Sequence, residues 1–249
     1  MKRFKWEIIL GISLLLLSFF IYLVHYFIFS DLHHIFLYLI GDIAFVFFEL
    51  LLVTLIIEQL LSKREKRARL EKMNMVIEAF FSAVGKKLLA YLSDCDPHLD
   101  TIRRELVVTN VWSDQEFIAV SKRLKGYDYG VEINKVRLED LHSFLLGNKE
   151  FLLRLLENPT LLEHESFTEL LRAVFHLTEE LSVRERFAGL PSADYKHLAG
   201  DIKRVYVLLV SQWLDYMKYL KENCPYLFHL AVRMNPFDQT ASPIIRGTS

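Results

Sequence analysis

The sequence predicts an all-α protein made of an N-terminal transmembrane helical hairpin, a helical stalk and a cytoplasmic helical bundle. Long apolar runs are concentrated in the first 61 residues. Beyond them, apolar residues recur at spacings of three and four, which is typical of helices, and no segment shows the alternation of a strand. The expected divisions are a hairpin over 1–61, a juxtamembrane stalk over 62–92, a cytoplasmic domain over 93–234 and an extended tail over 235–249.

Two N-terminal segments are apolar and long enough to cross a bilayer. Residues 8–29 contain no Asp, Glu, Lys or Arg, and residues 35–61 form a longer second segment. At about 1.5 Å per residue these helices would reach roughly 33 and 40 Å, whereas a hydrocarbon core is about 30 Å thick. The first segment is too long for a signal peptide and no cleavage site follows it, so we expect it to be retained.

Basic residues flank this pair of segments and predict its orientation. MKRFK before the first segment has three Lys or Arg and SKREKRAR after the second has five, whereas the connecting SDLHH has none. Because basic residues stay on the cytoplasmic side, both termini are predicted to be cytoplasmic. Each basic residue beside an anionic leaflet contributes about 1 kcal/mol, so we expect lipid headgroups to contact five residues: Lys63, Arg64, Lys66, Arg67 and Arg69.

The second segment carries two acids near its middle, Asp42 and Glu49. Seven residues of helix turn through about 700°, so both acids share one face to within about 20°. Each costs about 2.5–3.5 kcal/mol if it is ionised and faces lipid. His25 of the first segment lies at a depth similar to that of Asp42, which makes a pair of the two geometrically plausible. Asp42, Glu49 and His25 are the candidate intramembrane polar site.

Two main interpretations of these acids remain open, a structural role and a path for cations or protons, and a third is that they bind some other polar ligand. In the structural one they are protonated, or bond to Ser13, Ser18 or His25 or to a neighbouring copy. In the functional one several copies place Asp42 and Glu49 around an axis, where rings of carboxylates favour cations. Both interpretations require association, so the sequence predicts a homo-oligomer that contacts lipids and, in the second case, cations.

The leading functional prediction is a cation channel or ion-linked assembly that the cytoplasmic domain gates or assembles. The alternative is a membrane-anchored interaction or sensor module that does not conduct and in which the acids only fix helix pairing. The sequence contains no phosphate-binding Gly-rich loop, G-x-S-x-G or H-E-x-x-H, so we expect no enzyme and no cofactor. The net charge of −1 provides no overall positive potential to attract nucleic acid, so no nucleic-acid partner is expected.

Metal and thiol chemistry is not expected either. Cys95 and Cys224 lie in no Cys-x-x-Cys pattern and are predicted to be reduced thiols. Glu139-x-x-His142 matches only half of a di-iron pattern. Asp194, His197 and Asp201 share a helix face and could bind a cation, but a solvated surface is favoured.

Local signals mark the cytoplasmic helices. No Gly or Pro interrupts residues 43–84, which predicts one helix from the second segment into the stalk. Ser113 with Glu116, and Ser166 with Glu169, have the spacing of capping boxes. Asn158-Pro159 marks a further helix start, and an apolar stripe predicts a long helix over 193–222.

Two C-terminal runs carry a resemblance to a known family. They are LLRAVFHLTEEL and HLAGDIKRVYVLLVSQWLDYMKYLKENCPYLFHLAVRMNPFD. The chain resembles, over nearly its whole length, a family of prokaryotic membrane proteins with two N-terminal spans and a helical cytoplasmic domain. The resemblance implies this layout and a prokaryotic inner-membrane location. The family has no established activity, so it supplies no site residues.

Overall fold

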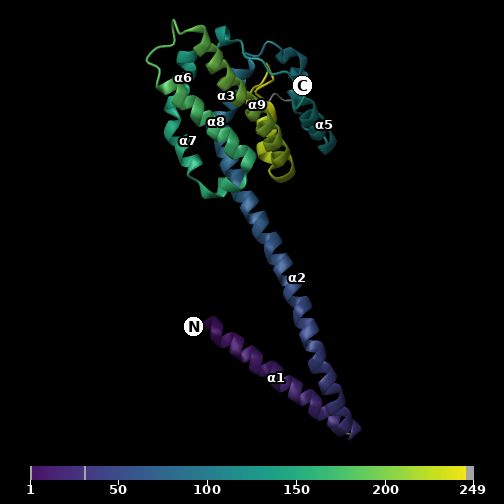
Figure 1. The fold of residues 1–249 in the computed structure, drawn as a ribbon. Helices are drawn as coiled ribbons and strands as arrows, with labels where there is room; N and C mark the ends of the chain where they lie inside the picture. The colour runs from purple at the N-terminus through teal and green to yellow at the C-terminus, as the bar shows by residue number, and fades with distance from the viewer. Residues whose placement is uncertain (1, 31, 245–249) are drawn as a thin grey trace. The chain divides into compact units, whose positions relative to one another are not determined.

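The computed structural model describes residues 2–30 and 32–244, and within these ranges the chain forms helices and no strand (Figure 1). This confirms the predicted all-α class. The chain divides into two compact units, an N-terminal unit of Met1–Lys66 and a C-terminal unit of Arg67–Ser249. The finer division into hairpin, stalk, cytoplasmic domain and tail stays a prediction. Asp31 of the SDLHH turn and residues 245–249 of the tail lie outside the described residues.

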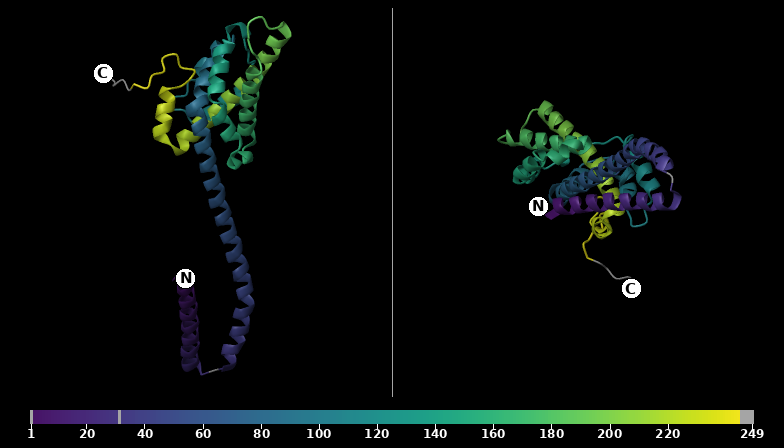
Figure 2. Two further views of the ribbon diagram at one scale, coloured as in Figure 1. Left: turned by 90° about the vertical axis from the view of Figure 1, so that its left-hand side faces the viewer. Right: turned by 90° about the horizontal axis from the view of Figure 1, so that it is seen from below.

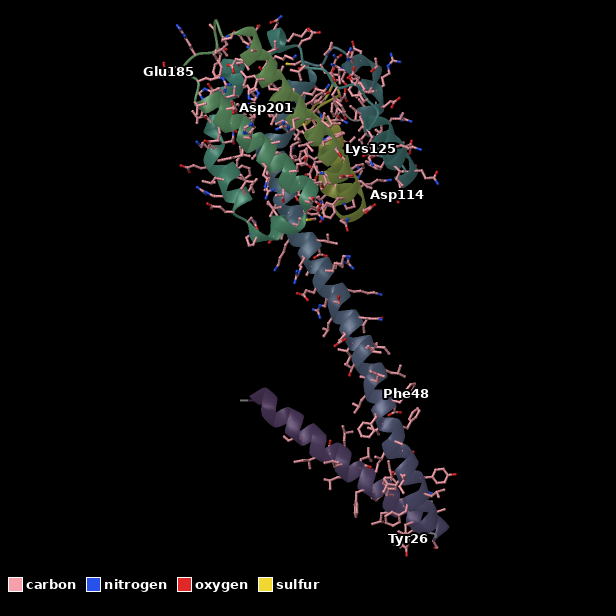
Figure 3. The ribbon with its side chains drawn as sticks, in the orientation of Figure 1. Tyr26, Phe48, Asp114, Lys125, Glu185 and Asp201 are labelled. Atoms are coloured by element: carbon pink, nitrogen blue, oxygen red, sulfur yellow. The ribbon has the colours of Figure 1, made fainter. Side chains whose placement is uncertain are left out.

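Two helices account for the N-terminal unit: α1 spans Lys2–Phe29, and α2 spans Leu32–Phe80 and continues into the C-terminal unit. Both contain stretches long and apolar enough to cross a membrane, and most side chains of those stretches are exposed in the monomer. Phe48, for example, projects outward from α2 (Figure 3). The two predicted helical segments are therefore confirmed as helices, while their packing as a hairpin stays a prediction.

The C-terminal unit is organised around one long helix, α9, which spans Ser192–Asn223. Helix α9 packs against α3, α5, α8 and α10, and the views from two further directions show α8 and α9 side by side (Figure 2). The other helices of this unit are α3 (Lys86–Ser93), α4 (Arg103–Leu106), α5 (Asp114–Leu124), α6 (Leu138–Gly147), α7 (Lys149–Leu156), α8 (Glu165–Ser182) and α10 (Pro225–Arg233). Short 3-10 turns lie at Leu99–Thr101, Ile133–Lys135 and Pro159–Glu163.

Helix α2 ends in the aromatic core of the C-terminal unit. Phe80 and Phe81 are fully buried. The ring of Phe81 stacks on Tyr216 of α9 with 4.8 Å between centroids, and Phe80 meets Phe167 of α8 edge to face at 5.4 Å. Offset and edge-to-face pairs of this kind stabilise a core beyond the area that they bury.

The predicted uninterrupted helix over 43–84 changes its winding near its end. Residues Phe81–Gly85 form a π-helical turn between α2 and α3. A Cβ atom on Gly85 would lie 2.7 Å from a ring carbon of Phe81 and 2.8 Å from one of Phe80. The wider turn therefore depends on glycine at this position. The absence of Gly and Pro from residues 43–84 does not predict this close approach of the backbone to two aromatic rings.

The capping predictions have mixed outcomes. Ser113 forms the predicted capping box with Glu116 at the start of α5. The second predicted box is wrong, because α8 begins at Glu165 and is capped by His164, whose Nδ1 accepts from the Phe167 N–H at 3.1 Å. Ser166 lies inside the first helical turn and accepts a hydrogen bond from Gln212 instead. The long helix predicted over 193–222 is confirmed as α9.

The chain after α10 is fastened to the C-terminal unit. Asn235 is buried, and its Nδ2 donates to the Leu106 carbonyl at 3.0 Å. Its Oδ1 accepts from the Phe237 N–H at 2.9 Å. The ring of Phe237 is buried against Trp213 of α9 with 5.2 Å between centroids. The start of the predicted tail therefore belongs to the core.

Candidate functional site

The predicted intramembrane residues lie on the two apolar helices. Asp42 and Glu49 are on α2, two turns apart, and both are exposed among exposed apolar side chains. His25 is on α1 and half-buried. The pairing of His25 with Asp42 stays a prediction. As described, the monomer leaves both carboxylates on its surface.

The predicted headgroup-binding residues also lie on α2. Lys63, Arg64, Lys66, Arg67 and Arg69 are all exposed. Arg67 makes an exposed ion pair with Glu71 one turn later, with 3.3 Å between Nε and Oε1. Such an exposed pair contributes little to stability, so it leaves the side chain able to exchange partners. The contact of these five basic residues with lipid headgroups stays a prediction.

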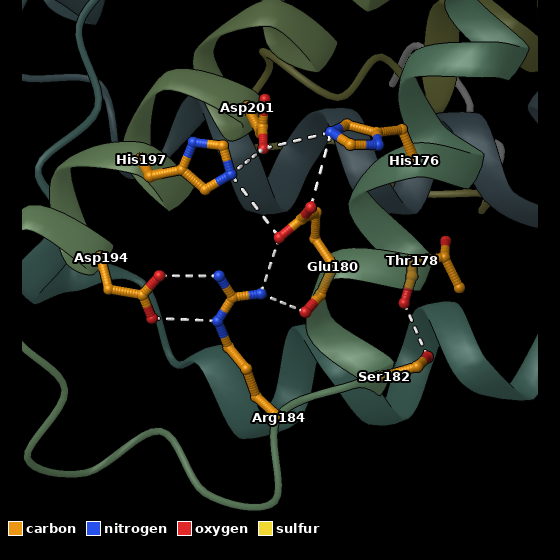
Figure 4. Close-up of polar contacts among 8 residues, drawn as sticks. All are labelled: His176, Thr178, Glu180, Ser182, Arg184, Asp194, His197 and Asp201. Carbon is orange, nitrogen blue, oxygen red and sulfur yellow. Dashed lines mark hydrogen bonds and ion pairs between the residues drawn. The ribbon is translucent and has the colours of Figure 1, made fainter.

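A second polar site lies between α8 and α9 in the C-terminal unit, and sequence reasoning found only part of it. His176 and Glu180 are one turn apart on α8, and His197 and Asp201 are one turn apart on α9. These four residues, here called the histidine–carboxylate cluster, point toward one another (Figure 4). Because side chains four residues apart share a helix face, each helix contributes one histidine and one acid.

The imidazoles of the histidine–carboxylate cluster face both carboxylates through their Nε2 atoms. His197 Nε2 lies 3.3 Å from Asp201 Oδ2 and 3.6 Å from Glu180 Oε2. His176 Nε2 lies 3.6 Å from Asp201 Oδ2 and 3.9 Å from Glu180 Oε1. The two nitrogens and three carboxylate oxygens therefore surround one small region between the helices.

Asp201 is the buried member of the cluster. It is 5% exposed, and its Oδ2 has no hydrogen-bond donor among the described residues. The two imidazoles approach this oxygen at ion-pair distances without hydrogen-bond geometry. Arg204, which is largely exposed, lies 3.6 Å from the other oxygen, Oδ1. A buried carboxylate oxygen without a partner is costly, so this atom requires a cation or a proton nearby.

Arg184 fixes the neighbouring acids. Its guanidinium binds Asp194 through two hydrogen bonds, with Nε to Oδ2 at 3.0 Å and Nη2 to Oδ1 at 2.7 Å. Its Nη1 also donates to Glu180 Oε2 at 2.8 Å. These hydrogen bonds lower the pKa of both Asp194 and Glu180 below their usual ranges. Glu180 therefore remains ionised beside the two histidines.

The sequence identified one half of this site. Asp194, His197 and Asp201 do share a face of α9, but the favoured solvated surface is wrong for Asp201, because α8 covers it. Reading the α9 face alone missed His176, Glu180 and Arg184. The available signal was a pair of motifs on consecutive helices, H-x-x-x-E at 176–180 and H-x-x-x-D at 197–201.

The Arg184 bridge is expected to stabilise the protein only while its acids are ionised. Ordinary pKa values are about 4.3 for Glu and 3.9 for Asp. Folding lowers the pKa of both Glu180 and Asp194. The stability that these two carboxylates contribute is therefore fully present above the ordinary pKa values and is lost as pH falls through the folded-state pKa values. Arg184→Met should lower the melting temperature at pH 7, and the difference from wild type should shrink toward about pH 3.

Circular-dichroism melts at the two pH values measure this effect. Arg154→Met is the matched control, because Arg154 pairs with Glu150 at the same i,i+4 spacing while both side chains are largely exposed. We expect the control to change the melting temperature little. An Arg184→Met deficit of equal size at both pH values would contradict the assignment.

Comparison with known proteins places this layout in a family. The family model described as "MJ1433, N-terminal helical domain" matches residues 2–61. The one described as "Uncharacterized protein MJ1433, C-terminal helical domain" matches residues 69–233. The "Uncharacterized protein MJ1433" of Methanocaldococcus jannaschii is 48% identical over 234 residues, which cover 94% of each chain. No solved structure matches. The chain therefore belongs to the MJ1433 family, with both of that family's helical domains present.

Proposed function

We propose that this protein is a homo-oligomeric membrane protein in which Asp42 and Glu49 of several copies line a polar path for cations. The observation that carries the proposal is the pair of exposed carboxylates on one face of an exposed apolar helix. The described part of the N-terminal unit consists of α1 and part of α2 only. A two-helix unit cannot enclose an aqueous path, so further copies would have to supply its other walls.

Insertion energies support this association. Fourteen Leu, Ile, Phe and Val residues lie between Phe36 and Leu55, and together they favour insertion by about 4–8 kcal/mol. Two ionised acids facing lipid would cost about 5–7 kcal/mol, which nearly cancels that gain. Turning Asp42 and Glu49 toward water or toward another copy removes this cost, and carboxylates around an axis favour cations.

The proposed setting is a prokaryotic inner membrane with both termini in the cytoplasm. The two apolar helices are long enough to span it. The basic residues at the start of α1 and within α2 would then lie on the cytoplasmic side, where the anionic leaflet attracts them. The proposal assigns the protein no catalytic reaction and no nucleic-acid partner.

A membrane-anchored sensor is the second candidate function. The observation that favours it is the histidine–carboxylate cluster, since a polar site built between two core helices can respond to a ligand or a cation. In that case Asp42 and Glu49 would only fix helix pairing within the membrane. The two candidates differ in whether the purified protein conducts ions.

Cation flux into liposomes containing the purified protein tests the proposal. We expect flux with wild type and a decrease of at least several-fold with Asp42→Asn or Glu49→Gln, because each change removes one ring of charge. Glu58→Gln is the matched control: nine residues beyond Glu49, it lies about 180° around the helix, so its loss should leave flux unchanged.

The oligomeric state in detergent separates the outcomes. An oligomer that conducts and responds to Asp42→Asn and Glu49→Gln supports the cation path. An oligomer that never conducts, or whose cation flux is the same with Asp42→Asn and Glu49→Gln as with wild type, favours the sensor. A monomer would refute both the path and the predicted assembly.

A further inference from the structure

We propose that the histidine–carboxylate cluster is a binding site for one divalent transition-metal ion of the zinc class, with His176, Glu180, His197 and Asp201 as ligands. The inference concerns the C-terminal unit alone and does not depend on whether the protein conducts. Its basis is the convergence of four donors from two helices on a buried carboxylate oxygen that lacks a hydrogen bond.

The donor types select the class of metal. Zn²⁺ and similar ions bind neutral imidazole nitrogen together with carboxylate oxygen. Mg²⁺ and Ca²⁺ prefer shells made of oxygen alone. In the cluster both histidines present Nε2 rather than a ring face, and each carboxylate presents at least one oxygen to them. Two nitrogens and two carboxylates make a set of four, the number usual for zinc.

The shortest nitrogen–oxygen distance of the cluster matches the spacing of metal ligands, and the other three are longer. Ligands of a tetrahedral ion with bonds of about 2.0–2.1 Å are roughly 3.3–3.4 Å apart. The four nitrogen–oxygen distances of the cluster are 3.3, 3.6, 3.6 and 3.9 Å. As they stand, the described residues form no ready-made set of three or more metal ligands, so binding must draw the donors together.

The histidines can make that adjustment. The side chains of His176 and His197 are 47% and 52% exposed, so they can rotate and admit an ion from solvent. Asp201 is held beneath them at 5% exposure. Glu180 is held by Arg184, which also donates two hydrogen bonds to Asp194. The two acids are thus held in place, Asp201 by burial and Glu180 by Arg184, whereas the two histidines are free to rotate.

Charge gives the reason for a cation here. Arg184 is occupied by Asp194 and Glu180, and Arg204 approaches only the Oδ1 atom of Asp201. The negative charge on the Oδ2 atom of Asp201 must therefore be compensated from the region between the two imidazoles. A divalent ion would supply that charge while the histidines stay neutral, whereas a protonated histidine is the competing explanation.

Titration of the full-length protein in detergent with Zn²⁺ at pH 7.5, after treatment with a chelator and its removal, tests the site. We expect calorimetry to show one ion per chain and thermal melts to show a rise in melting temperature, since a ligand stabilises the state that binds it. His197→Gln and Asp201→Asn should each weaken Zn²⁺ binding at least tenfold. Mg²⁺ at the same concentrations should have no effect.

One further variant, His229→Gln, serves as a control. Because Asp201 is buried, its replacement also affects folding, whereas the half-exposed His197 tests the site with little effect on the core. His229→Gln is the control: His229 is an exposed histidine that pairs with Asn110 at 3.0 Å outside the cluster. It should bind Zn²⁺ as wild type does.

Three results would overturn the proposal. One is the absence of Zn²⁺ binding to wild type. Another is binding that His197→Gln and Asp201→Asn both leave intact. The third is stabilisation produced by lowering pH from 8 to 6 with no response to Zn²⁺, which would show that protons alone partner Asp201.

Discussion

Replacing Phe80 with alanine is expected to lower the free energy of unfolding of the C-terminal unit by about 3–5 kcal/mol. Phe80 is fully buried, and its ring lies 5.4 Å from both Phe81 and Phe167, measured between centroids. Alanine would remove the ring and leave a cavity beside Phe81 of the π-helical turn and Phe167 of α8. These neighbours are themselves fully buried and can collapse only partly into such a cavity, so the cost is expected near the upper range for core changes.

Urea unfolding of the full-length protein in detergent, followed by tryptophan fluorescence, measures this loss as a lower midpoint with an unchanged slope. Ile118→Ala on α5 is the control, because Ile118 is exposed and its truncation should change stability by about 0.5 kcal/mol or less. If Phe80→Ala were no more destabilising than Ile118→Ala, the end of α2 would not belong to the core.

Removing residues 1–66 is expected to move the protein from the membrane fraction to the soluble fraction. The deleted part contains α1 and the apolar half of α2, in which most of the described apolar side chains are exposed in the monomer. Twelve Leu, Ile, Phe and Val residues between Gly11 and Ile28 favour insertion by about 4–7 kcal/mol. The remaining chain keeps every residue of the buried core, which begins at Met73.

Fractionation of cell lysates and circular dichroism of the fragment test this prediction. The fragment should need no detergent and should melt cooperatively with a helical spectrum, while the full chain should pellet with membranes. A full-length protein found in the soluble fraction would refute the membrane assignment. A fragment that pellets with membranes would place a second membrane-binding surface in the C-terminal unit.

The helices of the C-terminal unit were largely predictable because their signals are local. The apolar stripe along residues 193–222 predicted α9 to within one residue at each end. Ser113 and Glu116 are adjacent on a helical turn and cap α5 as their spacing indicates. The His164 cap of α8 was missed because an imidazole is an unusual acceptor at that position.

The histidine–carboxylate cluster was only half predictable because it depends on helix pairing. Periodicity places His197 and Asp201 on one face of α9, but it does not indicate which helix covers that face. The partners on α8 are 21 residues away in sequence, since His176 and Glu180 precede His197 and Asp201 by that interval. Asp42 and Glu49 are the opposite case: their positions are evident in the sequence, whereas what surrounds their side chains stays a prediction.

The fastening of the chain after α10 has a consequence for the order of folding. Asn235 donates to the carbonyl of Leu106, 129 residues earlier, and Lys221 donates to the carbonyl of Trp112 across 109 residues. Contacts this distant in sequence form late, because long stretches of chain must first be ordered between them. During synthesis, the carbonyls of Leu106 and Trp112 therefore cannot form these hydrogen bonds until Asn235 and Lys221, near the end of the chain, have been made. We expect α4 and α5 to be the last helices of the C-terminal unit to become stable in a newly made molecule.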